Sequence, residues 1–103
     1  CILFAIALHD RTGWRMVDVV DQTGGFVHTM CYDGTRLCDV RGRFTRSEVR
    51  RYYSDPKMSF KPPRLSTMQR CIWGVKYFGI SEARRARRYS ARWLRERGIK
   101  AKG

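Results

Sequence analysis

Acidic and histidine side chains are scarce in this sequence. Nine Asp and Glu and two His occur among 103 residues, and neither His9 nor His28 lies in a recognisable nucleophile or metal motif. Residues 23–25, Thr-Gly-Gly, lack both the spacing and the lysine of a phosphate-binding loop. Because general acid–base and nucleophilic catalysis need such groups in defined arrangements, we predict that the protein is not an enzyme and has no small-molecule substrate.

Cysteine is also sparse. The four cysteines form no C-x-x-C pair, and the arginine-rich composition does not indicate a secreted, disulfide-bonded protein. We expect reduced thiols that are buried as small apolar side chains. The alternative is a zinc site made of His28, Cys31, Cys38 and Cys71, although the gap between the first two cysteines of this set is long for neighbouring ligands. The prediction is no metal and no cofactor.

The hydrophobic run near the start of the chain is short. Residues 2–8, ILFAIAL, are too few to cross a bilayer, and we expect them to form a buried strand. The alternative is the remnant of a removed targeting segment. The sequence begins at Cys1 without an initiator methionine, which indicates a processed or truncated form. A membrane partner is not expected from these features.

Positive charge is what the sequence has in excess. It carries 22 Lys and Arg against nine Asp and Glu, a net charge of +13, and 17 of the cations are arginines. The 43% of hydrophobic residues is enough for a folded core, so the charge belongs to a folded protein rather than a disordered tail. Guanidinium groups bind phosphate bidentately and stack on bases. We therefore predict a nucleic acid as the partner rather than an anionic membrane.

Four segments combine strand-like composition with turn residues at regular intervals between them, which predicts an antiparallel meander. They are residues 2–8, 14–20, 26–32 and 36–40. In the second segment, Met16 and Asp18 should face one way and Val17 and Val19 the other. Asp33-Gly34 is the strongest hairpin signal, because both residue types tolerate the positive backbone angle of a tight turn.

The hydrophobic period changes after these segments. Thr45-Arg46-Ser47-Glu48 is a capping box, so a short helix is predicted over residues 46–53. The prolines of the next stretch, residues 54–65, exclude a helix and indicate an extended basic connector. A second capping box at residues 66–69 begins a helix that should end at Gly79. Its predicted packing face consists of Met68, Cys71, Ile72, Val75 and Phe78.

An arginine-rich helix is predicted over residues 82–97. Ser81 can cap its start with its side-chain oxygen, and Gly98 can take the left-handed conformation that ends a helix. The packing stripe of this helix consists of Ala86, Tyr89, Ser90, Trp93 and Leu94. Because the helix follows Gly79 almost directly, we expect a hairpin with the preceding helix. In that hairpin the two aromatic residues of the stripe would pack on Met68, Ile72 and Val75.

The predicted fold class is α+β. A small antiparallel β-meander of about four strands is followed by three helices, and the last two form a helical hairpin. Residues 1–103 then make up a single small basic domain. Its sheet part covers 1–44, and its helical part covers 45–103 and includes the proline-rich connector 54–65.

Two groups of arginines are predicted to bind RNA. On the last helix, only Glu82 and Glu96 oppose the arginines, so a polyanion is the natural partner. At the end of the predicted sheet, arginines flank aromatic rings, a combination that suits phosphates and unpaired bases. The predicted RNA-binding residues are Arg36, Arg41, Arg43, Arg46, Arg50, Arg51 and Tyr52, together with Arg84, Arg85, Arg88, Arg92 and Arg95. The alternatives are a solvated charged face and aromatic residues that belong to the core.

Residues 30–43, MCYDGTRLCDVRGR, resemble a strand–turn–strand segment of the translation initiation factor one-A family, in which a C-[FY]-D-G turn precedes R-L-C-x-[IV]-R-G-[KR]. The resemblance implies an OB fold that binds the decoding region of the small ribosomal subunit. It would place Arg36, Arg41 and Arg43 on or beside an RNA-facing surface. The sequence departs from the family after Phe44, where a helix is predicted in place of two further strands.

Residues 49–66, VRRYYSDPKMSFKPPRLS, resemble the bacterial-type small-subunit ribosomal protein eighteen family, which has a similar helix, extended segment and P-x-R-[IL]-[ST] entry into a basic helix. The helix that follows matches this family less well. The two resemblances cannot both extend over the whole chain. They agree on translation and on ribosomal RNA.

The expected function is that of a structural RNA-binding protein of a ribosome, with ribosomal RNA and neighbouring ribosomal proteins as partners. An arginine-rich, processed chain favours the small subunit of a mitochondrial ribosome in the matrix, and a cytoplasmic ribosome is the alternative. Two further functions stay open. One is an accessory subunit of a mitochondrial membrane or respiratory complex, whose arginines would face acidic lipid headgroups. The other is a dissociable protein that acts like an initiation factor.

Overall fold

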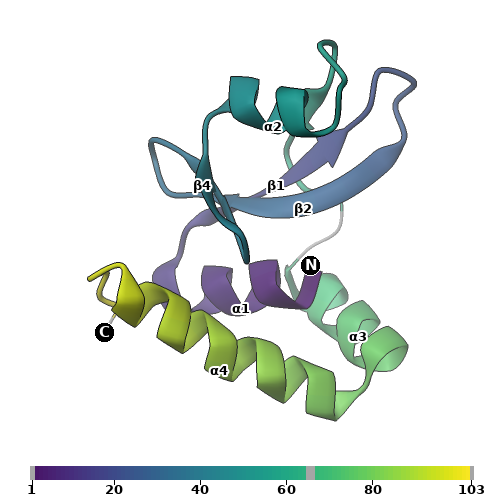
Figure 1. The fold of residues 1–103 in the computed structure, drawn as a ribbon. Helices are drawn as coiled ribbons and strands as arrows, with labels where there is room; N and C mark the ends of the chain where they lie inside the picture. Colours follow the sequence, from purple (N-terminus) through teal and green to yellow (C-terminus); the bar gives the residue numbers. More distant parts are fainter. Residues whose placement is uncertain (1, 65–66, 103) are drawn as a thin grey trace.

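A computed structural model of the protein describes residues 2–64 and 67–102 (Figure 1). The fold has the predicted α+β class, with an antiparallel sheet and helices on both of its faces. The elements are α1 (Ile2–Thr12), β1 (Arg15–Val20), β2 (Phe26–Tyr32), β3 (Leu37–Asp39), β4 (Gly42–Phe44), α2 (Arg46–Tyr52), β5 (Ser59–Lys61), α3 (Thr67–Phe78) and α4 (Ile80–Glu96). Helices α3 and α4 form the predicted helical hairpin.

The sheet has the strand order β4-β3-β2-β1-β5, and each neighbouring pair is antiparallel. Its first four strands are a meander in which β1, β2 and β3 fall within predicted segments, whereas β4 was not predicted. Gly34 in the turn between β2 and β3 has the expected positive φ of 105°. The fifth strand was not predicted. It comes from the proline-rich connector and pairs with β1, with Val19 opposite Phe60. The helical part of the chain, predicted over 45–103, therefore contributes an edge strand to the sheet.

The prediction of a strand at residues 2–8 is wrong, because these residues form helix α1. Residues 2–8 of this helix are apolar on all sides, and Ile2, Phe4, Ala5, Ile6, Ala7 and Leu8 are all buried. In a run of residues without polar positions, there is no hydrophobic periodicity that distinguishes a buried strand from a buried helix. Helix α1 ends at Gly13, whose φ of 76° and hydrogen bond from its N–H to the His9 carbonyl stop the helix and lead directly into β1.

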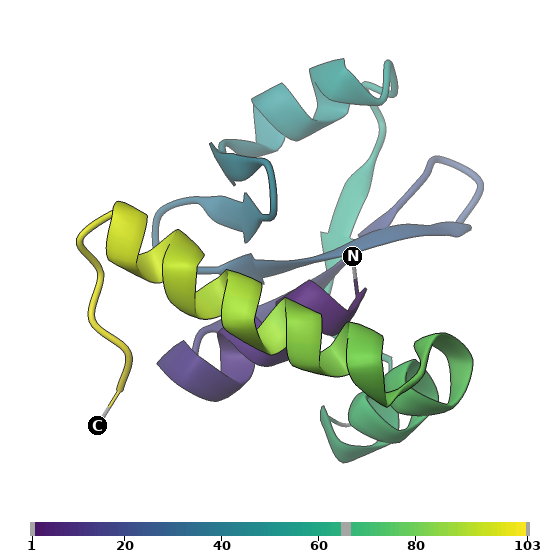
Figure 2. The same cartoon turned by 60° about the horizontal axis from the view of Figure 1, so that its bottom comes forward.

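Two hydrophobic clusters lie on the two faces of the sheet. On the α1 face, Met16 and Cys31 pack with α1 and with Trp93 of α4. On the α2 face, Val17, Val19, Met30, Leu37 and Val49 form the second cluster. The alternation predicted for β1 is thus confirmed. Figures 1 and 2 show the resulting layers: α2 covers one face, α1 covers the other, and α4 lies on the outer side of α1.

Helix α4 is fixed by its contact with α1. The Trp93 ring meets Phe4 and Trp14 edge to face, at centroid distances of 6.0 and 6.3 Å. The prediction that Tyr89 and Trp93 pack on Met68, Ile72 and Val75 is therefore wrong. The predicted Ser81 cap is wrong as well, because the helix starts at Ile80 after the N-cap Gly79 and Ser81 lies inside it. Gly98 does take the expected positive φ, at 67°.

Helix α3 turns most of its predicted packing face outward, although Cys71 is partly buried and packs against the α1-face cluster. Met68 is 73% exposed and Ile72 is 61% exposed. The inward side is formed instead by Arg70, which is buried, and by Gly74, where an added Cβ would lie 2.5 Å from the Leu3 side chain of α1. Residues 65 and 66, which include the first position of the second capping box, lie outside the described residues.

A buried ion pair accounts for this orientation of α3. The Arg70 guanidinium donates a 2.6 Å hydrogen bond to the carboxylate of Asp18 in β1, and each side chain is only 3% exposed. Arg70 also donates to the hydroxyl of Thr29 in β2, at 3.2 Å. A buried charge needs an opposite charge and hydrogen bonds, so the helix must present residue 70 to the sheet. Most of its large apolar side chains are left exposed.

Replacing Arg70 by Leu should lower the free energy of unfolding by roughly 3 to 5 kcal/mol, because it leaves the Asp18 carboxylate buried without its partner. The matched control is Arg87→Leu, which breaks the exposed Arg87–Asp10 pair and should cost less than about 1 kcal/mol. Urea denaturation measures both values. Equal losses in the two variants would contradict the anchoring role of Arg70.

Candidate nucleic-acid interface

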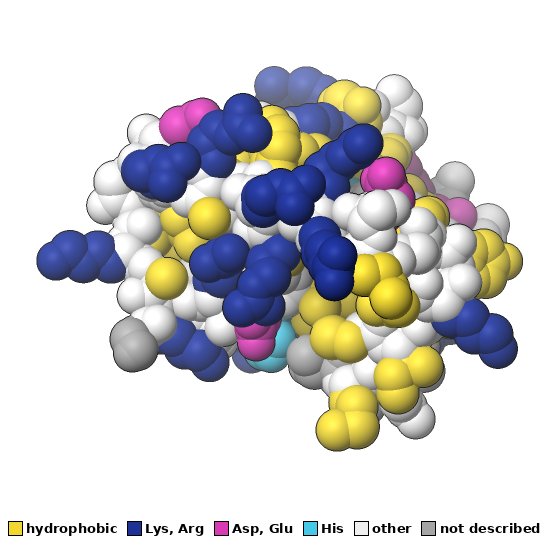
Figure 3. All heavy atoms as spheres, turned by 90° about the horizontal axis from the view of Figure 1, so that it is seen from below, with side chains coloured by type: hydrophobic (Ala, Val, Ile, Leu, Met, Phe, Trp, Pro, Cys, Tyr) yellow, Lys and Arg dark blue, Asp and Glu magenta, His cyan; other side chains and the backbone are white. Residues whose placement is uncertain are grey.

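Four arginines of α4 form one exposed stripe, the α4 arginine face: Arg84, Arg88, Arg92 and Arg95. Their spacing of four, four and three residues places them along one side of the helix, over roughly 16 Å of its axis. Figure 3 shows Lys and Arg side chains gathered over α4. Among the described residues, none of these four guanidinium groups forms an ion pair. Their positive charge is available to a partner.

The other arginines of α4 have contacts within the protein. Arg87 pairs with Asp10 of α1 at 3.2 Å, and Arg85 lies 3.6 Å from Glu82 in an exposed pair. Arg97, just after the helix, stacks its guanidinium 4.0 Å from the centre of the Trp93 ring and donates to the Trp93 carbonyl. Of the residues predicted on this helix, Arg85 is therefore the one that already has a carboxylate nearby.

The second predicted group surrounds the start of α2. The capping box forms as predicted: the Thr45 hydroxyl accepts from the Glu48 N–H at 3.2 Å, and the Glu48 carboxylate accepts from the Thr45 N–H at 2.9 Å. This motif starts α2 directly after β4. It places Arg46, Arg50 and Arg51 of the helix beside the arginines of the β2–β4 hairpins.

Two of the hairpin arginines are neutralised by buried carboxylates. Arg41 donates to Asp39 at 2.6 Å, and Arg43 forms an ion pair with Asp33 at 2.6 Å. The His28 imidazole lies 3.0 Å from the same Asp39 carboxylate. These two arginines stabilise the hairpins. Arg36, Arg46 and Arg51 are the exposed members of the group that form no ion pair among the described residues.

The pKa values of these carboxylates follow from their partners. Burial acts to raise the pKa of Asp39, but the hydrogen bonds from His28 and Arg41 outweigh it and lower the pKa from 3.8 to about 2. The pKa of Asp33 is also lowered, because hydrogen bonds from Arg36, Thr35 and Arg43 outweigh its burial. Both groups are therefore anionic at neutral pH, and the hairpins are held by charge.

Arginines and aromatic rings do alternate around α2, and many of them stack on one another. The Arg41 guanidinium lies 4.1 Å from the centre of the Tyr52 ring. Arg50 lies 5.2 Å from the ring of Phe60, a residue of β5 that sequence reasoning missed because the connector was not predicted to join the sheet. The Arg46 guanidinium lies 5.8 Å from the centre of the Phe60 ring and 5.7 Å from the centre of the Tyr32 ring. Each of these rings therefore already has a guanidinium against it.

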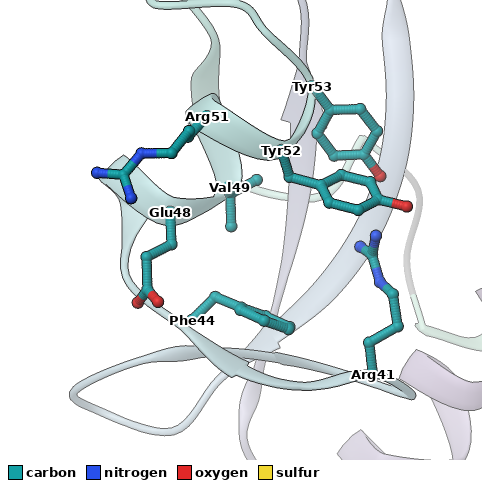
Figure 4. A pocket seen from close by; sticks show the side chains of 7 residues that line it. All are labelled: Arg41, Phe44, Glu48, Val49, Arg51, Tyr52 and Tyr53. Atoms are coloured by element: carbon teal, nitrogen blue, oxygen red, sulfur yellow. The ribbon is translucent and has the colours of Figure 1, made fainter.

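The adjacent tyrosines Tyr52 and Tyr53 differ in exposure. Tyr52 is 66% exposed, whereas Tyr53 is half-buried against the α2-face cluster. Tyr52 also borders an open cavity of about 340 Å³ between β4 and α2 (Figure 4). The lining residues are Arg41, Phe44, Glu48, Val49, Arg51, Tyr52 and Tyr53. Phe44 is partly buried, so it contributes both to the core and to this cavity.

The structure does not bring the two arginine groups onto one surface. The α2 group lies on one face of the sheet, and the α4 arginine face lies beyond α1 on the other (Figures 1 and 2). A single short RNA helix cannot contact both at once across a molecule with extents of 35 × 32 × 18 Å. They form two separate candidate contacts.

The cysteines contribute to the core. Cys31 of β2 lies opposite Cys38 of β3 in the strand register, and both residues are fully buried. Burial raises the pKa of each thiol to about 12. Both belong to the α1-face cluster, whereas His28 contacts Asp39 on the other side of the sheet. In the described part of the chain, no three His, Cys, Asp or Glu side chains are placed to hold a metal ion.

The stability of the protein should depend on the charge of Asp39. Because its folded pKa is lowered, the carboxylate contributes stability above pH 4, and this contribution is lost as the pH falls through about 2. The free energy of unfolding of the wild type should exceed that of Asp39→Asn by about 2 kcal/mol at neutral pH. The difference should shrink between pH 4 and 2 in urea titrations. A difference that stays constant over this window would contradict the assignment.

Comparisons of the chain with models of known protein families, with curated proteins and with solved structures found no match. The arrangement of charge, aromatic rings and exposed surface is therefore what indicates its function.

Proposed function

We propose that this protein is a structural RNA-binding protein of a ribosome and that it holds ribosomal RNA through the α4 arginine face. The observation that carries the proposal is the set of four arginines without an ion-pair partner among the described residues, displayed on a helix that Trp93 fixes against α1. A chain with a net charge of +13 needs a polyanionic partner to neutralise it. Phosphates along an RNA backbone supply that charge at regular intervals.

The exposed face of α3 supports a place within a larger assembly. Met68 and Ile72 lie on one side of the helix and are 73 and 61% exposed, and Tyr77, on another side, is 71% exposed. Figure 3 shows hydrophobic side chains beside the arginines of α4. Large apolar patches on a protein surface mark sites of contact with another protein or a membrane. Neighbouring ribosomal proteins are the partners that we propose for this face.

The proposed particle is the small subunit of a mitochondrial ribosome, with a cytoplasmic ribosome as the alternative. The resemblances of residues 30–43 and 49–66 to two families of the translation machinery support this choice of particle. A dissociable factor that acts like an initiation factor would use the same RNA contacts. Such a factor would be found on free small subunits and would leave when the subunits join.

A second candidate function is an accessory subunit of a mitochondrial membrane or respiratory complex. The aromatic, apolar face of α3 beside basic α4 favours it, because such surfaces also suit acidic lipid headgroups. No helix in the described ranges is long and apolar enough to span a bilayer. Co-sedimentation with ribosomal particles in moderate salt supports the first function, and extraction only with detergent-solubilised complexes supports the second.

Binding to structured RNA should weaken steeply as the salt concentration rises. Replacing Arg84, Arg88, Arg92 and Arg95 together by Gln should reduce the slope of log K against log salt by about four, because each arginine that contacts a phosphate contributes about one. The control is Arg87→Gln, which removes an arginine that already pairs with Asp10 and should leave the slope nearly unchanged. Fluorescence anisotropy with a labelled RNA stem–loop measures both.

An affinity that does not depend on salt would overturn the proposal. So would a quadruple variant that keeps the full slope, since the phosphates would then be bound elsewhere on the molecule.

A further inference from the structure

The cavity between β4 and α2 has the shape and lining of a site for a flat aromatic ligand. Figure 4 shows the Phe44 ring below the opening, Tyr52 above it and Val49 at the back, while Arg41 and Glu48 stand at opposite ends. Its volume of about 340 Å³ is at the small end of the range for ligand pockets. The Arg41 guanidinium lies 4.1 Å from the centre of the Tyr52 ring. A planar group in the cavity would therefore stack on this arginine–tyrosine pair and on the ring of Phe44.

The walls of this cavity are held in place by the fold. Val49 is only 3% exposed, and the Thr45–Glu48 capping box fixes the start of α2 against β4. Arg41 is held by its ion pair with Asp39. Tyr52, in contrast, leaves two thirds of its surface in water. A site whose walls are already ordered loses little conformational entropy when it binds a ligand.

The mouth of the cavity is positively charged. Arg36 and Arg51 are both exposed. Both lie near enough to Glu48 to contribute to lowering its pKa, although its hydrogen bonds with Thr45 contribute more. In Figure 4 the Arg51 side chain lies on the same side of the cavity as Glu48, opposite Arg41. An aromatic-lined cavity beside two arginines that form no ion pair among the described residues matches a base linked to phosphates, because base stacking and phosphate neutralisation act together in binding single-stranded RNA.

We propose that this cavity binds one unpaired base of a single-stranded RNA segment, with the adjoining phosphates on Arg36 and Arg51. The inference rests on the proposed RNA-binding function and adds a second contact on the opposite side of the sheet from the α4 arginine face. The α4 arginine face would hold structured RNA by charge, and the cavity would hold a loop or bulge by stacking. The protein would then bridge two RNA elements.

The test uses the full chain and a labelled single-stranded oligoribonucleotide. Tyr52→Ala should weaken its binding about tenfold, because stacking on one aromatic residue contributes of that order. Tyr52→Phe should bind as the wild type does, since it keeps the ring. Tyr77→Ala is the matched control: Tyr77 is 71% exposed but lies on α3, and its loss should have no effect. The salt slope of Tyr52→Ala should equal that of the wild type, because stacking releases no counterions.

A second measurement examines the base directly. An abasic nucleotide is placed at each position of the oligonucleotide in turn. At one position, this replacement should weaken binding by the wild type about tenfold. The same replacement should have little further effect on binding by Tyr52→Ala. The inference is overturned if Tyr52→Ala binds like the wild type, or if no abasic position matters. It is also overturned if adenosine monophosphate displaces the oligonucleotide at equal concentration, which would assign the cavity to a free nucleotide.

These outcomes are distinct from failure of the proposed function. Loss of the salt slope in the α4 quadruple variant, together with unchanged binding by Tyr52→Ala, would remove the cavity inference and retain the proposed function. Affinity for structured RNA that is independent of salt would remove the proposed function itself.

Discussion

The packing of apolar helix α1 between the sheet and α4 is the contact on which the rest of the structure depends. Its buried side chains meet Met16 and Cys31 of the sheet on one side and Trp93 of α4 on the other. The edge-to-face contacts of Trp93 with Phe4 and Trp14 fix the rotation of α4 about its own axis. Because the apolar stripe of α4 is committed to α1, its four free arginines must face away from the core. The burial of α1 thus determines which side chains α4 presents to a partner.

The few carboxylates of the chain are used where the fold needs them. Asp18, Asp33 and Asp39 bind Arg70, Arg43 and Arg41, and all three lie in or beside the strands. These pairs hold α3 and the β2–β4 hairpins in place. The positive charge of the sheet region is therefore partly neutralised. Among the described residues, the carboxylates that form ion pairs with arginines of α4 are those of the exposed Glu82 and of Asp10 in α1. On α4, four arginines that form no ion pair among the described residues lie along one side of the helix, where a polyanion can approach them.

Features that depend on neighbouring residues were predicted correctly from the sequence, whereas features that depend on residues far apart in the chain were not. The alternation of β1 and the Thr45–Glu48 capping box depend on a few adjacent residues, and both are confirmed. Helix α1 could not be distinguished from a strand because it lacks a polar face. Strand β5 is three residues long and exists through its pairing with β1, some forty residues earlier. The orientation of α3 depends on Asp18, which is 52 residues from Arg70 in the sequence. The periodic apolar stripe of α3 was therefore assigned to the core, and most of it is in fact exposed. For the same reason, charge alone identified the arginines of the site but not which of them already have carboxylate partners.

Locating the chain in an intact particle tests the central claim most directly. Ribosomal subunits purified from mitochondria in moderate salt can be imaged by electron cryomicroscopy at a resolution that shows side chains. The account predicts that the guanidinium groups of Arg84, Arg88, Arg92 and Arg95 lie within hydrogen-bonding distance of ribosomal RNA phosphates, while the exposed face of α3 is covered by a neighbouring protein. A chain found in a membrane complex, or one bound to the ribosome with its α4 arginine face in solvent, would contradict it.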